Sequence, residues 1–281
     1  MGGNRKRLRN NAEKIKDIDD CINFSIGDPD LTTNTAITEA AFKDALDGHT
    51  KYTHIRGYVE LRDEIRKFYA EEYNMDVKDQ EVMVIASGLF GMYMTLQAVL
   101  DPGDEVLILT PSFSSYFGQV KMAGGVPIQV PTFEEEDFQI NMERLESFVT
   151  TKTKVLIVNS PSNPTGNCLS KRTMEEIAEF AKKYDLLVVA DDIYTSFSFQ
   201  NKFEPIASIP GMRERTVIIN SFSKNFFTEK FEREGIDDKY ELFELPEIER
   251  FRDLIDNVPL NGLNVTIPYK EQVMQFLDEI D

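Results

Sequence analysis

The sequence predicts an α/β fold in which a mainly parallel sheet is flanked by helices and followed by a small α/β C-terminal segment. From residue 36 the chain alternates stretches of helical spacing with short apolar runs. The apolar runs are rich in β-branched residues and do not alternate with polar ones, which is typical of parallel strands buried on both faces. The 281 residues allow one large α/β domain or two ordinary domains.

Helices are expected where apolar residues recur every three or four positions and where turn residues mark the ends. Ser87 and Gly88 begin one helix directly after an apolar run, and Gly124-Gly125 ends another. The turn at 101–104 separates a helix from the strand that follows. The expected helices cover 36–46, 58–73, 88–99, 112 to the break at 124, 141–149 and 171–184.

Strands are expected where short apolar runs lie between these helices. They cover 81–86, 105–109, 126–130, 154–158, 186–191 and 216–220. After residue 224 the same alternation continues with shorter elements. Helices are expected over 225–234, 246–256 and 269–280, and strands over 239–245 and 262–267.

Composition narrows the classes of function. Lys and Arg total 31 against 49 Asp and Glu, and the resulting net charge of −18 argues against nucleic acid or an anionic membrane as partner. No apolar stretch is long enough to span a bilayer, and the basic start lacks the apolar run of a signal peptide. The distant Cys21 and Cys168 predict reduced thiols in a cytoplasmic protein. His49 and His54, without a nearby cysteine, predict no metal site.

Lys224 is the first candidate for chemistry. It follows the apolar run 216–219, so it leaves the carboxyl end of a strand, where open α/β sheets form their ligand crevice. A lysine in such a pocket can lose its proton and attack a carbonyl group. Taken alone, the motif is equally compatible with a solvated lysine at a helix start.

Other strand ends carry side chains that suit a flat, phosphorylated ring. The turn at Gly88 opens a helix whose free N–H groups suit a phosphate, and Phe113 suits stacking on a ring. Asn163 lies in a proline-containing loop as a hydrogen-bond donor. Asp191 can keep a pyridine nitrogen protonated, and Tyr194 can donate to a phenolate oxygen. Each has a plain structural alternative, such as a common strand–glycine–helix turn or a core aromatic residue.

Together these motifs resemble the class I/II, fold-type I, pyridoxal-phosphate aminotransferases over about residues 20–226. The matching pieces, in the order of that family, are Phe-Ser-Ile-Gly-Asp-Pro-Asp at 24–30, Lys-Tyr-Thr at 51–53, Ser-Gly at 87–88, the loop 159–166, Asp-x-Ile-Tyr at 191–194 and Ser-Phe-Ser-Lys at 221–224. The resemblance implies transamination between an amino acid and a 2-oxo acid with pyridoxal phosphate as cofactor, in a homodimer.

The resemblance also implies a role for each matching residue. Lys224 would be the Schiff-base lysine and later the proton shuttle. Around the ring, Asp191 would pair with the pyridine nitrogen, Tyr194 and Asn163 with the ring oxygen, and Phe113 would stack on the ring face. The remaining roles would be phosphate binding by Gly88, Leu89 and Ser221, phosphate binding in the partner subunit by Tyr52, and substrate carboxylate binding by Gly27.

The sequence departs from the family directly after the lysine. The family continues with a Thr-Gly-Trp-Arg-like run whose arginine binds the phosphate, whereas this chain has Glu232 at that position. A carboxylate repels a phosphate, and Arg233 is turned away by about 100° if this segment is helical. The family's C-terminal domain, with the arginine for the substrate carboxylate, is not found either. These departures predict weak cofactor binding and impaired transamination.

Residues 221–281 instead resemble the start of shikimate dehydrogenase. The run Asn-Val-Thr-Ile-Pro-Tyr-Lys at 264–270 matches a signature of that family, and the serines at 221 and 223 match its Ser-x-Ser opening. This resemblance implies that Ser221 and Ser223 bind the shikimate carboxylate, that Asn264 and Thr266 bind ring hydroxyls, and that Lys270 is the catalytic lysine. The NADP-binding domain of that family, with its glycine-rich motif, is not found, so NADP would be a cofactor only if that domain were present.

The two resemblances share residues 221–226, which suggests a chimera. We therefore expect an incomplete aminotransferase-like domain over 1–220 and a shikimate-dehydrogenase-like substrate-binding fragment over 221–281. The predicted function is impaired pyridoxal-phosphate-dependent transamination. Two alternatives stay open: a fragment that binds shikimate without turning it over, and a non-catalytic relic.

Overall fold

The computed structural model describes residues 33–198 and 202–222. The chain divides into two units, Met1–Thr50 with Glu244–Asp281, and Lys51–Phe243. The boundary predicted at 220/221 is a different one and stays a prediction. In the first unit, helix α2 (Thr35–Leu46) is the described element, and Oδ1 of Asn34 caps it by accepting a hydrogen bond from the Ala36 N–H at 2.8 Å.

The second unit is built on a five-stranded sheet in which every pairing is parallel. The strand order is β2-β1-β3-β4-β5. This confirms the predicted parallel sheet. The strands are β1 (Glu105–Thr110), β2 (Val126–Pro131), β3 (Thr153–Asn159), β4 (Leu187–Asp191) and β5 (Thr216–Ile219).

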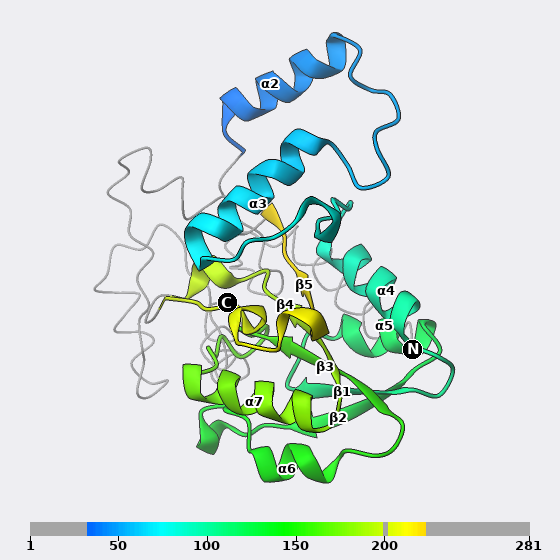
Figure 1. The fold of residues 1–281 in the computed structure, drawn as a ribbon, viewed down its shortest axis with the longest axis vertical. Coiled ribbons are helices and arrows are strands. Elements are labelled where there is room, and N and C mark those ends of the chain that lie inside the picture. Colours follow the sequence, from blue (N-terminus) through cyan, green and yellow to red (C-terminus); the bar gives the residue numbers. More distant parts are fainter. Residues whose placement is uncertain (1–32, 199–201, 223–281) are drawn as a thin grey trace, which may run out of the picture. The chain divides into compact units, whose positions relative to one another are not determined.

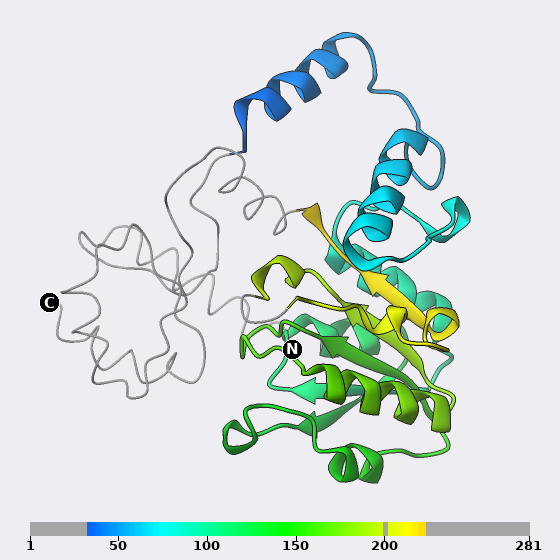
Figure 2. The ribbon, with the colours of Figure 1, turned by 60° about the vertical axis from the view of Figure 1, so that its left-hand side comes forward.

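Helices cover both faces of this sheet (Figures 1 and 2). Helices α4 and α5 pack on one face, and α6 and α7 pack on the other. The α-helices of this unit are α3 (Val59–Tyr73), α4 (Gly88–Val99), α5 (Ser115–Met122), α6 (Met142–Ser147) and α7 (Lys171–Lys183). Short 3₁₀ turns lie at Asp79–Glu81, Glu134–Glu136, Thr195–Phe197, Ile206–Ser208 and Arg213–Arg215.

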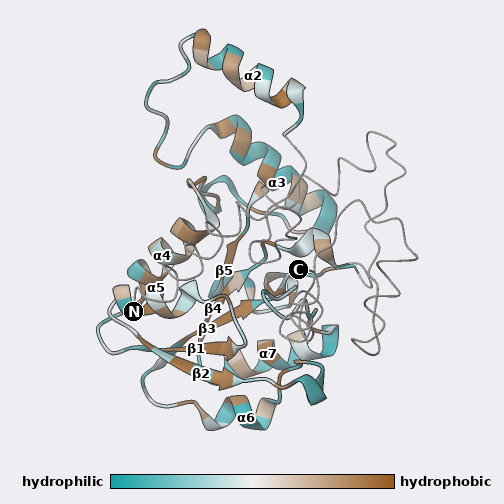
Figure 3. Ribbon diagram, turned by 180° about the vertical axis from the view of Figure 1, so that it is seen from behind, coloured by the Kyte–Doolittle hydropathy of each residue, from teal (hydrophilic) through white to brown (hydrophobic). Residues whose placement is uncertain are grey.

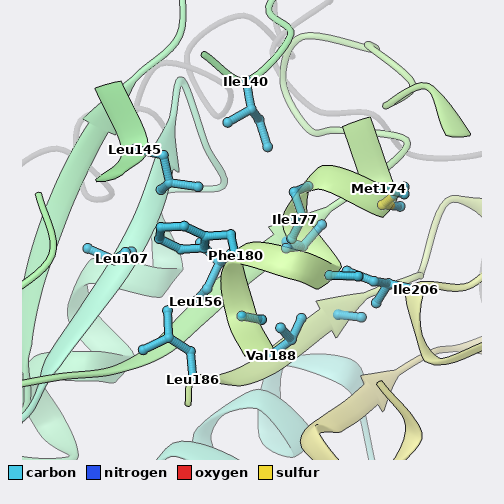
Figure 4. Close-up of a cluster of buried hydrophobic side chains, with 14 of the residues drawn as sticks. Leu107, Ile140, Leu145, Leu156, Met174, Ile177, Phe180, Leu186, Val188 and Ile206 are labelled. Carbon is cyan, nitrogen blue, oxygen red and sulfur yellow. The ribbon is translucent and has the colours of Figure 1, made fainter. Parts of the chain in front are cut away.

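Successive residues of each strand point to opposite faces of the sheet and pack into two separate cores. Both faces are therefore apolar, which explains the continuous apolar runs in the sequence. In β1, Val106 and Ile108 join the core under α4 and α5, whereas Leu107 joins the core under α6 and α7. Figure 3 shows the apolar colours concentrated on the strands. Figure 4 shows Phe180 of α7 beside Leu107 in the core under α6 and α7, with Ile177 of the same helix nearer to Met174.

One predicted strand is not formed. Residues 82–86 carry no strand pairing in the described structure, and a 3₁₀ turn occupies Asp79–Glu81. A strand needs a neighbour for its backbone groups, and here the N–H of Val84 instead donates to the carbonyl of Arg56 at 3.1 Å. The predicted strand 81–86 is therefore wrong, although Val82 is buried as an apolar strand residue would be. The elements predicted beyond residue 224 lie outside the described residues.

The strand order fixes where a ligand crevice can form. From β1 the chain moves to β2 on one side, and from β3 it moves through β4 to β5 on the other side. In sheets of this order the crevice opens at the carboxyl ends of the strands, around the point where the winding reverses. A small cavity of about 30 Å³ lies there, with Ile108, Ile157 and Asn159 among its lining residues. Within the described ranges no helix combines the length and apolarity needed to cross a membrane.

Candidate active site

Asp191 is the last residue of β4 and lies at this carboxyl edge. Its side chain is buried, and its Oδ2 accepts a hydrogen bond from the hydroxyl of Tyr116 on α5. Its Oδ1 is also buried and has no hydrogen-bond partner among the described residues. A buried polar atom without a partner is rare in native structures, so this oxygen is suited to a donor supplied by a ligand.

The environment of Asp191 changes its acidity. Burial raises the pKa of the Asp191 carboxyl, and the hydrogen bond from Tyr116, followed by a smaller effect of the Ile193 backbone N–H, opposes this rise. Burial together with the charge of Asp191 raises the pKa of the Tyr116 phenol well above its usual value, so Tyr116 stays protonated as a donor. The pair therefore presents an acceptor at Oδ1 whose ionised form gains from a positively charged partner.

Asn163 and Tyr194 form the second part of the site. The side-chain amide of Asn163 donates to the Tyr194 hydroxyl at 3.2 Å, which leaves the proton of that hydroxyl for another acceptor. Burial raises the pKa of Tyr194, so the hydroxyl stays protonated at neutral pH. The two side chains predicted to act together on one oxygen are thus neighbours in the structure.

Asn159, at the end of β3, holds the loop of Asn163 in place. Its Nδ2 donates to the backbone carbonyl of Asp191 at 2.9 Å, and its Oδ1 accepts from the backbone N–H of Asn163 at 2.8 Å. This one side chain therefore ties the β3 loop to the end of β4. Its role explains why Asn163 and Asp191 are placed at the same edge.

Phe113 lies between β1 and α5, next to the Asp191 pair. Its ring meets the ring of Tyr116 edge to face, with 5.7 Å between centroids and 78° between planes. It is only partly buried, so part of the ring is free to contact a ligand.

Gly88 is the first residue of helix α4, at the carboxyl edge of the sheet. A Cβ atom at this position would lie 2.6 Å from Cδ1 of Ile193 and 3.5 Å from Cγ2 of Ile219, so a larger residue here would require the end of the Ile193 side chain to shift. Ser87 caps the helix through a 3.2 Å hydrogen bond from the Phe90 N–H. The N–H groups of the first helical turn have no partner within the helix, which makes this end attractive to an anion.

The strand that leads to Ser221 passes the start of α4, because Ile219, two positions earlier, lies against the Gly88 position. The Ser221 N–H donates to Oδ1 of Asn220 at 2.7 Å. The predicted phosphate-binding groups of Gly88, Leu89 and Ser221 therefore belong to adjacent segments. Leu89 itself has an exposed side chain, so its contribution would come from the backbone N–H.

Of the other predicted site residues, the described structure includes Tyr52. Tyr52 is fully exposed, and no contact joins it to Asp191, Asn163 or Gly88. The remaining predicted site residues, which are Gly27, Ser223, Lys224, Asn264, Thr266 and Lys270, lie outside the described residues.

Tyr116 and Asn159 are site residues that sequence reasoning missed. Tyr116 lies three positions after Phe113, inside the segment expected to be helical from residue 112, and this spacing was the available signal, although Phe113 precedes α5 in the structure. Asn159 was visible as the polar end of a buried strand. Its side-chain bonds to two backbones depend on tertiary placement, which spacing alone does not reveal.

Two family models match the chain. One is described as aminotransferase class I and II and matches residues 19–228. The other is described as the shikimate dehydrogenase substrate binding domain and matches residues 216–281. The two matches overlap over 216–228, a stretch that contains the predicted shared segment 221–226.

Curated relatives agree with the first match. An aspartate aminotransferase of Pyrococcus abyssi is 44% identical over 224 residues, which cover 79% of this chain and 57% of that protein. An aromatic-amino-acid aminotransferase of Thermococcus litoralis is 39% identical, with 79% of this chain and 58% of that protein covered. The chain thus spans a little over half the length of these relatives.

Solved structures give the same result. The aromatic aminotransferase of Pyrococcus horikoshii has a TM-score of 0.72 at 39% identity, covering 78% of this chain and 60% of that one. The aspartate aminotransferase of Thermus thermophilus with maleate has a TM-score of 0.72 at 33% identity, covering 81% and 58%. By the extent of the family match, the identity to these relatives and the shared fold-type I architecture, the chain belongs to the class I and II aminotransferases.

Proposed function

We propose that the chain binds pyridoxal phosphate at the carboxyl edge of its sheet and supports weak transamination between an amino acid and a 2-oxo acid. The observation that carries the proposal is the buried Oδ1 of Asp191, which has no partner among the described residues. A protonated pyridine nitrogen would supply the missing donor and a positive charge. The residues present therefore fit the ring end of the cofactor.

Each described residue has a role toward this ring. Asp191, oriented by Tyr116, holds a proton on the ring nitrogen. Tyr194 donates its free proton to the ring oxygen, with Asn163 beside it. Phe113 excludes water from one face of the ring. When bound, pyridoxal phosphate supplies an electron sink for the electron pair left when an amino acid loses its α-proton.

Lys224 is the remaining residue that the proposed chemistry needs, and its role is inferred from the sequence motif. Its amine would hold the cofactor, and it would afterwards carry the proton that leaves the amino acid. It stands three positions after Ser221, whose segment adjoins the N-terminus of α4. The proposal therefore places covalent attachment and phosphate binding on one short segment.

The phosphate end is the reason that we propose weak activity. Glu232 stands where the family has an arginine, and a carboxylate there repels the phosphate dianion. The aminotransferase match also stops at residue 228, and the chain continues with the segment similar to shikimate dehydrogenase. The phosphate would then depend on the helix N-terminus and on Ser221.

The test is covalent loading rather than turnover. The purified chain is incubated with pyridoxal phosphate, the absorbance near the edge of the visible range is recorded, and the adduct is fixed with borohydride for peptide mapping. We expect one modified lysine, Lys224, and no adduct in Lys224→Ala. Lys171→Ala, which changes an exposed lysine on α7, is the matched control and should load like the wild type. Equal loading of Lys224→Ala would overturn the assignment.

We propose in addition that two copies form the working unit. Tyr52 and Ile55 expose their side chains strongly, and Leu89 and Phe90 on the first turn of α4 are about half exposed. Large apolar side chains left exposed on one unit favour an interface. Tyr52 would then reach the phosphate of the partner. Sedimentation velocity checks the state: a monomer at micromolar concentration contradicts the dimer.

Shikimate binding is the second candidate, favoured by the match of residues 216–281 to the shikimate dehydrogenase substrate binding domain. The residues proposed to bind shikimate are Ser221, Ser223, Asn264 and Thr266, and Lys270 corresponds to the catalytic lysine of that family. Calorimetry with shikimate tests binding, and Asn264→Ala should remove the heat of binding. No NADPH oxidation with dehydroshikimate is expected from this chain, so observed oxidation would contradict the proposal.

A further inference from the structure

A second hydrogen-bonded pair lies next to the phosphate end of the proposed site. The side-chain amide of Asn220 donates to the hydroxyl of Tyr69 at 3.2 Å, across 151 positions of sequence. The oxygen of the same amide accepts the Ser221 N–H at 2.7 Å. Asn220 therefore links helix α3 to the first residue of the predicted Ser-Phe-Ser-Lys segment.

Tyr69 is a fixed anchor for this link. It is 8% exposed and belongs to a small core with Met75 and Ala207. Its ring meets the ring of Phe68 edge to face at 5.5 Å between centroids, and it lies 5.6 Å from the ring of Tyr73. A side chain packed on several sides cannot follow a moving partner, so it holds Asn220 in one place.

The end of β5 needs such an anchor. Within the described residues β5 pairs with β4 alone, as the edge strand of the sheet. Its last paired residue is Ile219, so Asn220 and Ser221 receive no support from the strand ladder. Beyond the ladder, the amide of Asn220 contributes one bond to helix α3 and one to the backbone of Ser221.

The hydroxyl of Tyr69 remains neutral in these surroundings. Burial, together with the nearby Asp192, raises the pKa of Tyr69. A buried hydroxyl is tolerated when it is hydrogen-bonded, and the Asn220 amide provides a bond here. The packing of the ring would be the same for phenylalanine, so the hydroxyl is the informative part of the side chain.

We propose that Tyr69 is a positioning residue for the phosphate end of the site: through Asn220 it fixes the backbone of Ser221, and thereby the hydroxyl that binds the phosphate. This inference rests on the proposed cofactor function. It adds a residue of α3, far from the site in sequence, to the groups on which phosphate affinity depends.

The test compares Tyr69→Phe with Tyr73→Phe. Tyr73 lies on the same helix and in the same core, but its hydroxyl lies against Thr195. Dissociation constants are measured by absorbance titration for pyridoxal phosphate and for pyridoxal, which lacks the phosphate. Tyr69→Phe should weaken pyridoxal phosphate by about three- to ten-fold, as expected for one lost hydrogen bond. It should leave the dissociation constant for pyridoxal unchanged. Tyr73→Phe should change neither dissociation constant.

A readout without ligand accompanies the titration. Amide hydrogen exchange of Ser221, followed by NMR in the ligand-free chain, should be faster in Tyr69→Phe and unchanged in Tyr73→Phe. A general structural weakening would instead lower the affinity for both ligands equally and leave their ratio intact, and that result would overturn the inference. If the wild type takes up no pyridoxal phosphate at Lys224, the proposed function fails first, and the exchange rate alone then decides whether Tyr69 holds Ser221.

Discussion

The hydroxyl of Tyr116 donates a hydrogen bond to Oδ2 of Asp191, although 75 positions separate the two residues. Tyr116 comes from α5, the helix between β1 and β2, whereas Asp191 ends β4. One carboxylate oxygen is thereby occupied within the protein, and the other is left for a ligand. This division of the two oxygens makes the orientation of Asp191 independent of the ligand.

The first prediction concerns this bond. Tyr116→Phe removes the stronger of the two donors, Tyr116 and the Ile193 backbone, that oppose the effect of burial, so the pKa of Asp191 should rise further. An Asp191 that is more often protonated pairs less well with a protonated ring nitrogen. We expect affinity for pyridoxal phosphate to fall about three- to ten-fold. The carboxyl carbon shift of Asp191, followed by NMR against pH, reports the pKa directly.

Tyr93→Phe is the control for this experiment, because Tyr93 lies on α4 and has no bond to Asp191. It should titrate like the wild type. A Tyr116→Phe protein with an unchanged Asp191 titration would mean that the bond does not exist in solution.

The second prediction concerns Asp192, which is 3% exposed and whose buried Oδ2 has no partner among the described residues. Burial and the neighbouring Asp191 raise the pKa of Asp192 well above its usual value. Between the unfolded pKa of about 3.9 and the folded pKa, the folded state binds more protons than the unfolded state. Stability contributed by this group is therefore present at low pH and lost as pH rises.

Asp192→Asn removes the charge and keeps the shape. We expect the variant to equal the wild type near pH 4 and to exceed it by about 1–3 kcal/mol at neutral pH, as expected for removal of a buried unpaired charge. Urea unfolding between pH 4 and pH 8 measures the difference. Asp137→Asn, at an exposed position, should leave the slope with pH unchanged. Parallel curves for Asp192→Asn and the wild type would refute the prediction.

Most of the fold could be predicted because it depends on local pattern. The strand containing Val106, Leu107 and Ile108 is apolar on both faces, and such a run has few alternatives in an α/β chain. The segment around Val84 has the same local character but is not a strand, because pairing depends on a neighbour that local sequence does not specify.

The shared location of the described candidate residues was predictable for a similar reason, whereas their roles stay predictions. Asp191, Asn163 and Tyr194 stand at strand ends or in a motif, and the structure places them at one edge. The link from Tyr69 to Asn220 joins residues 151 positions apart, and no spacing rule connects them. Such long-range polar pairs depend on how α3 packs on the sheet edge.

The third prediction concerns Asp79, which accepts hydrogen bonds from Nε of Arg62 and Nη2 of Arg56, both at 2.7 Å. These bonds, with that from Arg62 the larger effect, lower the pKa of Asp79 to about 2. Its contribution is therefore present above the unfolded pKa and lost as pH falls from about 4 towards 2. Asp79→Asn should unfold at lower urea concentration at neutral pH, because buried Arg62 loses its charged partner.

The free energy of unfolding measured against pH on the acid side tests the role of Asp79 specifically. Asp79→Asn should lose less stability than the wild type between pH 4 and pH 2. Asp63→Asn, which changes an exposed partner of Arg66 on α3, is the control and should follow the wild type. An Asp79→Asn curve parallel to the wild type would show that the two arginines do not stabilise the carboxylate.

The last prediction decides between a folded protein and a relic that aggregates. Ile177 of α7 is fully buried in the core shared with Leu156 and Val188. Ile177→Ala should lower the free energy of unfolding by about 2–5 kcal/mol and Ile177→Val by about 0.5–1.5 kcal/mol, because each removes buried methyl groups from a close-packed interior. Urea unfolding followed by circular dichroism measures both, with Met122→Ala at an exposed position as the control. A graded loss requires a specific core and cooperative unfolding, which a collapsed relic lacks. If all three variants unfold alike over a broad transition, the two-core architecture is not the state of the protein in solution.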